Sequence, residues 1–109
     1  MEEISFEEFK KMDLRIGKVL SVERLPRTNK LYRLSVDVGM EKPVQIVTGL
    51  VPYYKEEELK DREIVVIVNL KPAKLSGEMS YGMLLCAEKD GSVVILGPEK
   101  AIGAGAQVR

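Results

Sequence analysis

Lysine and arginine side chains, which bind phosphate groups well, gather in two stretches of this sequence. Between residues 14 and 38 there are six bases and only two acids, which gives a local net charge of +4. These bases are Arg15, Lys18, Arg24, Arg27, Lys30 and Arg33. Between residues 69 and 82, Lys71 and Lys74 stand against one acid, Glu78. Such clusters suit the phosphates of a nucleic acid. The alternative is that they are ordinary solvated surface charges.

The sequence lacks the residues that most catalytic and metal sites require. It has no histidine and one cysteine, Cys86. This excludes histidine-based acid–base catalysis, Ser-His-Asp and Cys-His pairs, zinc fingers and disulfide frameworks. No glycine-rich phosphate loop or cluster of metal-ligating residues is present in the sequence. We therefore expect a protein that is not an enzyme and that holds no cofactor and no metal.

Length and composition predict one small domain over residues 1–109. The 109 residues are 45% hydrophobic and 31% charged, and 17 bases balance 17 acids. The acidic start, Met1-Glu2-Glu3, is unlike a signal peptide, and the longest apolar run, Ile64–Val68, is far too short for a membrane span. We expect a cytoplasmic protein without a membrane partner.

A short helix is expected to open the domain, and strands follow it. Ser5 and Glu8 form the pattern of a capping box, which predicts a helix over about Phe6–Met12. Residues 31–38 alternate between apolar and polar, so Tyr32, Leu34, Val36 and Val38 share one face of a strand. The strands are predicted at Leu14–Leu25 (with a bulge at Gly17), Leu31–Val38, Val44–Thr48, Glu63–Val68 (buried on both faces), Met83–Glu88 and Ser92–Leu96.

The connecting segments complete the predicted element order. A helical turn or two is expected within Tyr53–Leu59, a long irregular loop at Asn69–Gly82, and a hairpin turn at Asp90-Gly91. The order β-β-β-α-β-β is that of the OB-fold, a five-stranded Greek-key barrel. The fold class is therefore all-β with short helices, an N-terminal helix and a C-terminal extension; a small β-sandwich is the competing fold.

The basic stretches coincide with the parts that an OB-fold presents to nucleic acid, its strands 2–3 and two of its loops. Aromatic side chains, on which single-strand binders stack bases, are scarce: two Phe, four Tyr and no Trp. Phe6 and Phe9 are better explained by packing, and Tyr81 is the best-placed candidate for stacking. A structured RNA, read by its shape and phosphates, fits this surface better than a single strand.

Six strings in the right order closely resemble the tRNA-binding domain family. They are Asp13–Val19, Asn29–Tyr32, Val36–Gly39, Val47–Leu50, Asn69–Leu75 and Ser80–Leu85. The resemblance runs from about residue 6 to residue 108. The family includes the C-terminal domain of methionyl-tRNA synthetases, stand-alone dimeric tRNA-binding proteins and endothelial-monocyte-activating-polypeptide-like domains. Because the chain is little more than this domain and begins with Met1, it looks like a stand-alone subunit, such as a methionyl-tRNA synthetase beta subunit.

The resemblance implies non-catalytic tRNA binding by a homodimer, acting in trans with an aminoacyl-tRNA synthetase. It implies these tRNA contacts: Lys30, Arg33, Asn69, Lys71, Lys74, Ser80 and Met83, with Arg27 and Tyr81 as further candidates. Tyr81 departs from the family, which often has an acid there. Each residue also has a structural explanation: Asn69 closes a turn, Ser80 satisfies a backbone donor, Met83 belongs to the core, and the lysines are solvated.

Two further alternatives remain open. The C-terminal tail, Ala101–Ala106, is apolar but small-chained, so it is expected to pack with a barrel edge against a second copy of the chain. The alternative is that the tail closes its own barrel. The alternative function is a chaperone-like dimer of the same family that binds polypeptide, which would show a wide apolar patch near Met83.

Overall fold

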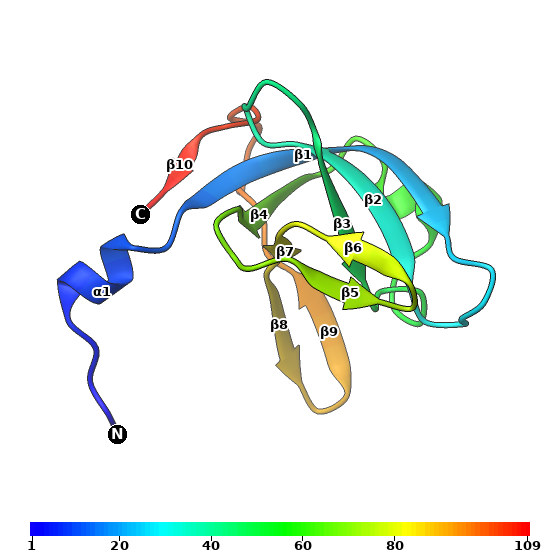
Figure 1. The fold of residues 1–109 in the computed structure, drawn as a ribbon, viewed down its shortest axis with the longest axis horizontal. Helices are drawn as coiled ribbons and strands as arrows, with labels where there is room; N and C mark the ends of the chain where they lie inside the picture. Colours follow the sequence, from blue (N-terminus) through cyan, green and yellow to red (C-terminus); the bar gives the residue numbers. More distant parts are fainter.

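The chain folds around a long, bent first strand that pairs with three others (Figure 1). The computed structural model describes all residues, Met1–Arg109. Its helices are α1 (Phe6–Lys10) and α2 (Glu56–Leu59). Its strands are β1 (Leu14–Arg24), β2 (Tyr32–Asp37), β3 (Val44–Thr48), β4 (Glu63–Ile67), β5 (Ala73–Leu75), β6 (Glu78–Ser80), β7 (Met83–Leu84), β8 (Cys86–Lys89), β9 (Ser92–Ile95) and β10 (Gln107–Val108).

The main sheet curls into a nearly closed antiparallel barrel. Its strand order is β3-β2-β1-β4-β7, and β10 pairs with the start of β1. The first half of β1 pairs with β4 and the second half with β2, with Lys18 opposite both Asp37 and Glu63. A register shift between Val19 and Ser21 bends β1 where it changes partner. This architecture confirms the OB-like fold and not the sandwich.

The barrel interior is filled by the alternating residues of β2 and by side chains from the strands around it. Tyr32, Leu34, Val36 and Val38 are all buried, as the alternation predicts. The bulge, however, is not at Gly17. Gly17 lies inside the barrel wall, where an added Cβ would be 2.6 Å from Val36 Cγ1. Glycine is therefore needed there because the wall is packed closely, not because the strand is irregular.

Two predicted segments differ from the structure. The stretch Asn69–Gly82 is not irregular, because it contains the β5–β6 hairpin, whose turn has Ser76 and Gly77 at positive φ. The predicted strand Met83–Glu88 divides at Leu85: β7 pairs with β4, and β8 leaves the barrel to pair with β9. The β8–β9 hairpin projects from the barrel (Figure 1) and turns at Asp90-Gly91, as predicted.

The shorter elements also refine the predictions. Ser5 and Glu8 form the capping box, but α1 ends at Lys10, and Phe6 is 71% exposed and so does not pack in the core. In β4, Ile64 and Val66 are fully buried, whereas their neighbours are partly exposed, so only one face of this strand is fully buried. Neither helix has the length and apolarity needed to cross a membrane.

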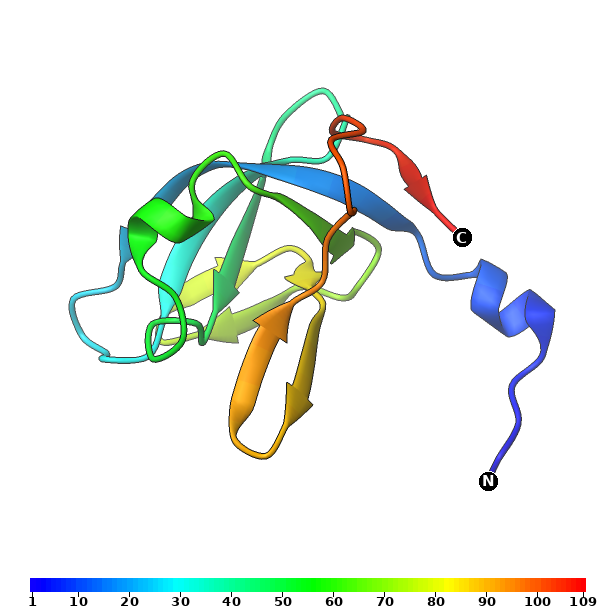
Figure 2. The same cartoon turned by 180° about the vertical axis from the view of Figure 1, so that it is seen from behind.

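The C-terminal tail runs back along its own barrel (Figure 2). The Glu63 carboxylate accepts hydrogen bonds from the backbone N–H groups of Ile102 and Gly103, at 3.0 and 2.9 Å. Gly105 then donates to the Ile16 carbonyl and packs against Gly39 so closely that neither position has room for a Cβ. The tail thus covers an edge of its own chain, and because its Ile102 remains 65% exposed, this packing does not exclude a contact with a second copy.

The close packing at Gly17 leads to a stability prediction. Gly17→Ala places a methyl group against Val36, so we expect the free energy of unfolding to fall by about 1–3 kcal/mol. The control is Gly49→Ala, whose Cβ would have its nearest neighbour at 3.9 Å. Urea denaturation of both variants measures the difference, and equal stabilities would contradict the packing argument.

Candidate nucleic-acid interface

The β5–β6 hairpin lies along β3 and closes the gap between β3 and β7. The buried Ser80 hydroxyl accepts a hydrogen bond from the Val47 N–H at 3.0 Å and donates one to the Gly82 carbonyl at 2.8 Å. Tyr81 N–H donates to the Gln45 carbonyl at 2.9 Å, and Gln45 Nε2 donates to the Met79 carbonyl at 2.8 Å. These bonds satisfy the outer edge of β3 and fix the hairpin's base on the barrel.

Three of the predicted contact residues have structural roles. Ser80 is 2% exposed and uses its hydroxyl within the barrel. Asn69 accepts a hydrogen bond from the Asp13 N–H at 2.8 Å and donates one to the Lys11 carbonyl at 2.6 Å, so it ties the root of the hairpin to the end of α1. Met83 packs against the core. These are the structural explanations that the sequence left open, although Asn69 bridges two segments rather than closing a turn.

Four of the predicted bases are exposed and make no ion pair: Arg27, Lys30, Lys71 and Lys74. Arg27 and Lys30 lie on the loop that joins β1 to β2, and Lys74 lies on β5. The tip of the hairpin faces that loop across a cleft of about 480 Å³, lined on one side by Leu25, Pro26 and Arg27 and on the other by Ser76 and Gly77. The structure thus places the tip of the hairpin that carries Lys74 beside the loop that carries Arg27 and Lys30.

Arg33 differs from these bases because its guanidinium is engaged by two carboxylates. Its Nη2 pairs with Glu23 on β1, and its Nη1 pairs with Glu78 on β6 at 2.5 Å. The hydrogen bonds to Glu23 and then to Glu78 raise the pKa of Arg33 above its usual value. The predicted phosphate contact is therefore a group whose charge is already compensated. Sequence reasoning could not foresee this pairing, because Glu78 is 45 residues away along the chain.

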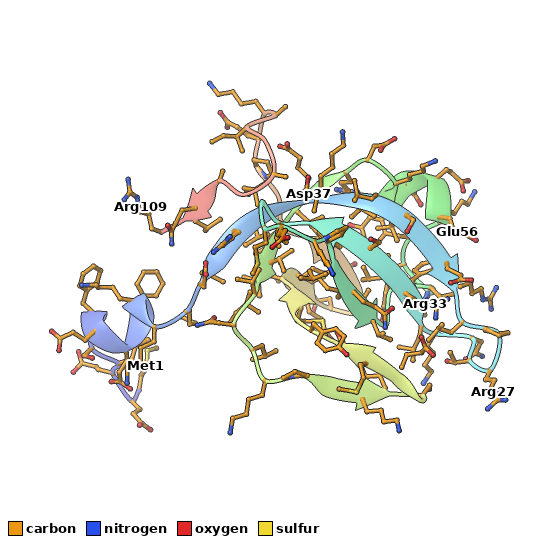
Figure 3. All side chains as sticks on the ribbon, turned by 45° about the horizontal axis from the view of Figure 1, so that its top comes forward. Met1, Arg27, Arg33, Asp37, Glu56 and Arg109 are labelled. Atoms are coloured by element: carbon orange, nitrogen blue, oxygen red, sulfur yellow. The ribbon has the colours of Figure 1, made fainter.

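The acidic start of the chain and the basic β1–β2 loop lie at opposite ends of the molecule. Figure 3 shows Met1 at one end, on the arm that carries Glu2, Glu3, Glu7 and Glu8, and Arg27 at the other end. Between them, Arg15 is bound to Asp13, and this hydrogen bond lowers the pKa of Asp13 and raises that of Arg15. Arg15 and Arg33 are thus the two bases that form ion pairs within the fold, whereas Arg27 at the far end forms none.

The remaining candidate, Tyr81, is 46% exposed, and only its backbone N–H is engaged. Sequence reasoning missed the hairpin that carries the basic residues, although the dipeptide Ser76-Gly77, between Lys74-Leu75 and Glu78-Met79, is a signal for a turn. Outside this surface, burial raises the pKa of the Cys86 thiol, which makes it a poor nucleophile. No group of three or more His, Cys, Asp or Glu side chains is placed to hold a metal ion.

A small OB-like barrel with two basic loops at one end defines a class of nucleic-acid-binding modules. Within that class, the chain belongs to the family described as the putative tRNA binding domain, which it matches over residues 14–107. This confirms the family resemblance seen in the sequence.

Relatives with known names agree with this assignment. Methionine–tRNA ligases of Archaeoglobus fulgidus and Methanosarcina mazei are 50% and 48% identical to 98% and 97% of the chain. The chain spans only 16% and 15% of the length of these ligases.

Solved structures extend the comparison. The MetRS-related protein of Pyrococcus horikoshii has a TM-score of 0.93 and 38% identity over all of both chains. The chaperone CsaA of Bacillus anthracis has a TM-score of 0.88 and 30% identity over 99% of this chain and all of that one.

The buried hydroxyl at the barrel closure leads to a second stability prediction. Ser80→Ala leaves the Val47 N–H without a partner inside the protein, so we expect the free energy of unfolding to fall by about 1–3 kcal/mol. The exposed Ser92→Ala is the control and is expected to stay within about 0.5 kcal/mol of the wild type. Chemical denaturation provides the measurement; a Ser80→Ala protein as stable as the control would show that the bridge is dispensable.

Proposed function

We propose that this chain binds tRNA without catalysing a reaction, through a basic surface made of Arg27, Lys30, Lys71 and Lys74. Two findings together support the proposal: the family to which the chain belongs and the exposure of these four bases. The chain matches the tRNA-binding family over 94 of its residues, 14–107, and these four bases are exposed and without an ion pair. Free ammonium and guanidinium groups release counterions when they meet phosphates, which drives binding.

The surface is suited to a folded RNA backbone. Lys71 and the hairpin tip are five residues apart, or at most roughly 17 Å along an extended chain. Beyond the tip, the cleft separates the hairpin from the loop that carries Arg27. Such an array touches several phosphates at fixed spacings, so it favours RNA of one shape over RNA of one sequence. Among the aromatic residues, Tyr81 is exposed and close in sequence to these lysines. One such ring offers little surface for stacking a run of bases.

The chain acts beside a methionyl-tRNA synthetase, as an auxiliary or beta subunit. Its resemblance to one part of methionine–tRNA ligases supports this role. A binding module held near a catalytic body raises the effective concentration of its ligand without taking part in the reaction. The MetRS-related protein of similar length from Pyrococcus horikoshii supports such a module outside a full-length ligase.

The active form is a homodimer in which the C-terminal tail and a barrel edge meet a second copy. Ile102 of the tail is 65% exposed, and β10 has a partner strand on one side only. Burying this apolar edge against a symmetry mate would remove an unpaired strand from solvent and double the basic surface. The dimer would present twice as many free bases to one ligand, although its net charge would still be zero.

The second candidate function is binding of exposed polypeptide, and the likeness to the chaperone CsaA favours it. Its expected sign was a wide apolar patch near Met83. Met83 instead packs against the core, although Leu70 and Tyr81 on the same connecting segment are 47% and 46% exposed. The free bases favour the tRNA proposal over this one.

The tRNA proposal predicts a salt-dependent affinity that individual lysines contribute to. Lys71→Ala and Lys74→Ala are each expected to weaken tRNA binding several-fold and to reduce the slope of log K against log salt by about 1. Lys89→Ala, on the β8–β9 hairpin, removes the same charge elsewhere and is the control. Fluorescence anisotropy with labelled tRNA, and single-stranded DNA as competitor, measures both quantities. No tRNA binding at low salt by the folded protein would overturn the proposal and favour polypeptide binding.

The dimer proposal predicts that one charge on the tail separates the subunits. Ile102→Asp would place a carboxylate in the apolar contact, so we expect a monomer at concentrations where the wild type is a dimer. Val94→Asp, at a residue 53% exposed on β9, is the matched control and should remain dimeric. Sedimentation equilibrium distinguishes the two masses. A monomeric wild type, or a dimeric Ile102→Asp, would contradict this interface.

A further inference from the structure

The two ends of the β5–β6 hairpin are held very differently. At its base, the buried Ser80, the Tyr81 backbone and the Met79 carbonyl are all bonded to β3. At its tip, Ser76 and Gly77 are exposed, and nothing lies within 4 Å of a Cβ built on Gly77. The cleft separates this tip from the β1–β2 loop, so packing does not hold the tip there.

Beyond Met79, one side-chain interaction joins the tip to the barrel. Glu78, the first residue after the turn, is bound to Arg33 on β2. Arg33 is bound in turn to Glu23, its direct cross-strand neighbour on β1. The guanidinium therefore links three strands, one of which carries the hairpin tip and one of which leads into the basic β1–β2 loop. A planar guanidinium with fixed donors suits such a link better than a flexible ammonium group.

Lys74 lies next to this link. It lies opposite Met79, which is bonded to β3, whereas its neighbour Leu75 lies opposite Glu78. A movement of the tip therefore begins at Leu75 and changes the direction in which the adjacent Lys74 side chain extends relative to Arg27 and Lys30. RNA of fixed shape binds most tightly when the phosphate-binding groups already have the right spacing. The protein then loses less conformational entropy on binding.

From this geometry we infer that Arg33 is a positioning residue, which holds the two basic segments in register through Glu23 and Glu78 and does not itself bind phosphate. This inference rests on the proposed tRNA binding and names how its surface is kept in shape. Its side chain is only 34% exposed and already lies against two carboxylates. A phosphate that approached it would meet the repulsion of both.

The positioning role of Arg33 predicts a change in tRNA affinity opposite to the one that charge alone predicts. Glu78→Gln removes a negative charge beside a basic surface, so simple electrostatics predicts tighter tRNA binding. If Arg33 were a phosphate contact, freeing it would tighten binding further. If Arg33 positions the hairpin, the same change loosens the tip, and we expect the Kd for tRNA to rise about two- to fivefold, the range for loss of a partly exposed ion pair.

The experiment is a double-mutant cycle with tRNA as the probe. We expect Arg33→Gln to weaken binding by a similar factor with an unchanged salt slope, and the double variant Arg33→Gln/Glu78→Gln to be no weaker than either single variant. Glu88→Gln, which removes the same charge on the β8–β9 hairpin, should leave the Kd unchanged or slightly lower. Hydrogen exchange at residues 74–79 of the free protein should be faster in both single variants than in the wild type.

Each failure has a separate signature. Tighter binding by Glu78→Gln, or a salt slope reduced by about 1 in Arg33→Gln, would overturn the positioning role and make Arg33 a phosphate contact. Unchanged hydrogen exchange in both variants would overturn it as well, since the tip would then be held without Arg33. If the folded wild-type protein binds no tRNA, the proposed function fails, and this inference fails with it. Thermal unfolding of each variant verifies that it is folded.

Discussion

The hydroxyl of Ser80 is the constraint on which the rest of the surface depends. A strand edge left open at β3 would expose the Val47 N–H, and a two-residue strand such as β7 is too short to cover it. The serine satisfies that donor from a neighbouring segment and bonds to the Gly82 carbonyl at the start of β7. The barrel closes at this point, and the same closure fixes the base of the hairpin that carries Lys74.

The molecule has no net charge, yet its basic residues differ in whether they form ion pairs. Arg15 and Arg33 are committed to acidic partners within the fold, whereas Arg27, Lys30, Lys71 and Lys74 have none. Four of the acids, Glu2, Glu3, Glu7 and Glu8, lie on the N-terminal arm, far from Arg27 in a molecule whose longest dimension is about 41 Å. Opposite charges separated by several Debye lengths do not cancel each other's field locally. Net charge therefore says little about which ligands this chain attracts.

The sequence predicts those features that depend on near neighbours. The alternation in β2, the capping box at Ser5 and the turn at Asp90-Gly91 all follow from local rules, and the structure contains them. The element order was enough to predict the barrel. The β5–β6 hairpin was missed because its strands have three residues each, too few to show a period. The partners of Arg33 and Ser80 were not predictable, since they come together only when distant strands meet.

Asn69 has a mechanical consequence for the whole chain. Its amide joins the end of α1 to the residue from which the hairpin segment departs, with one bond to Lys11 and one to Asp13. The projecting arm and the segment that leads into the basic hairpin are therefore attached to each other at one residue, Asn69. A force applied to the arm by anything attached to it would reach the start of the hairpin segment through these two hydrogen bonds as well as through β1.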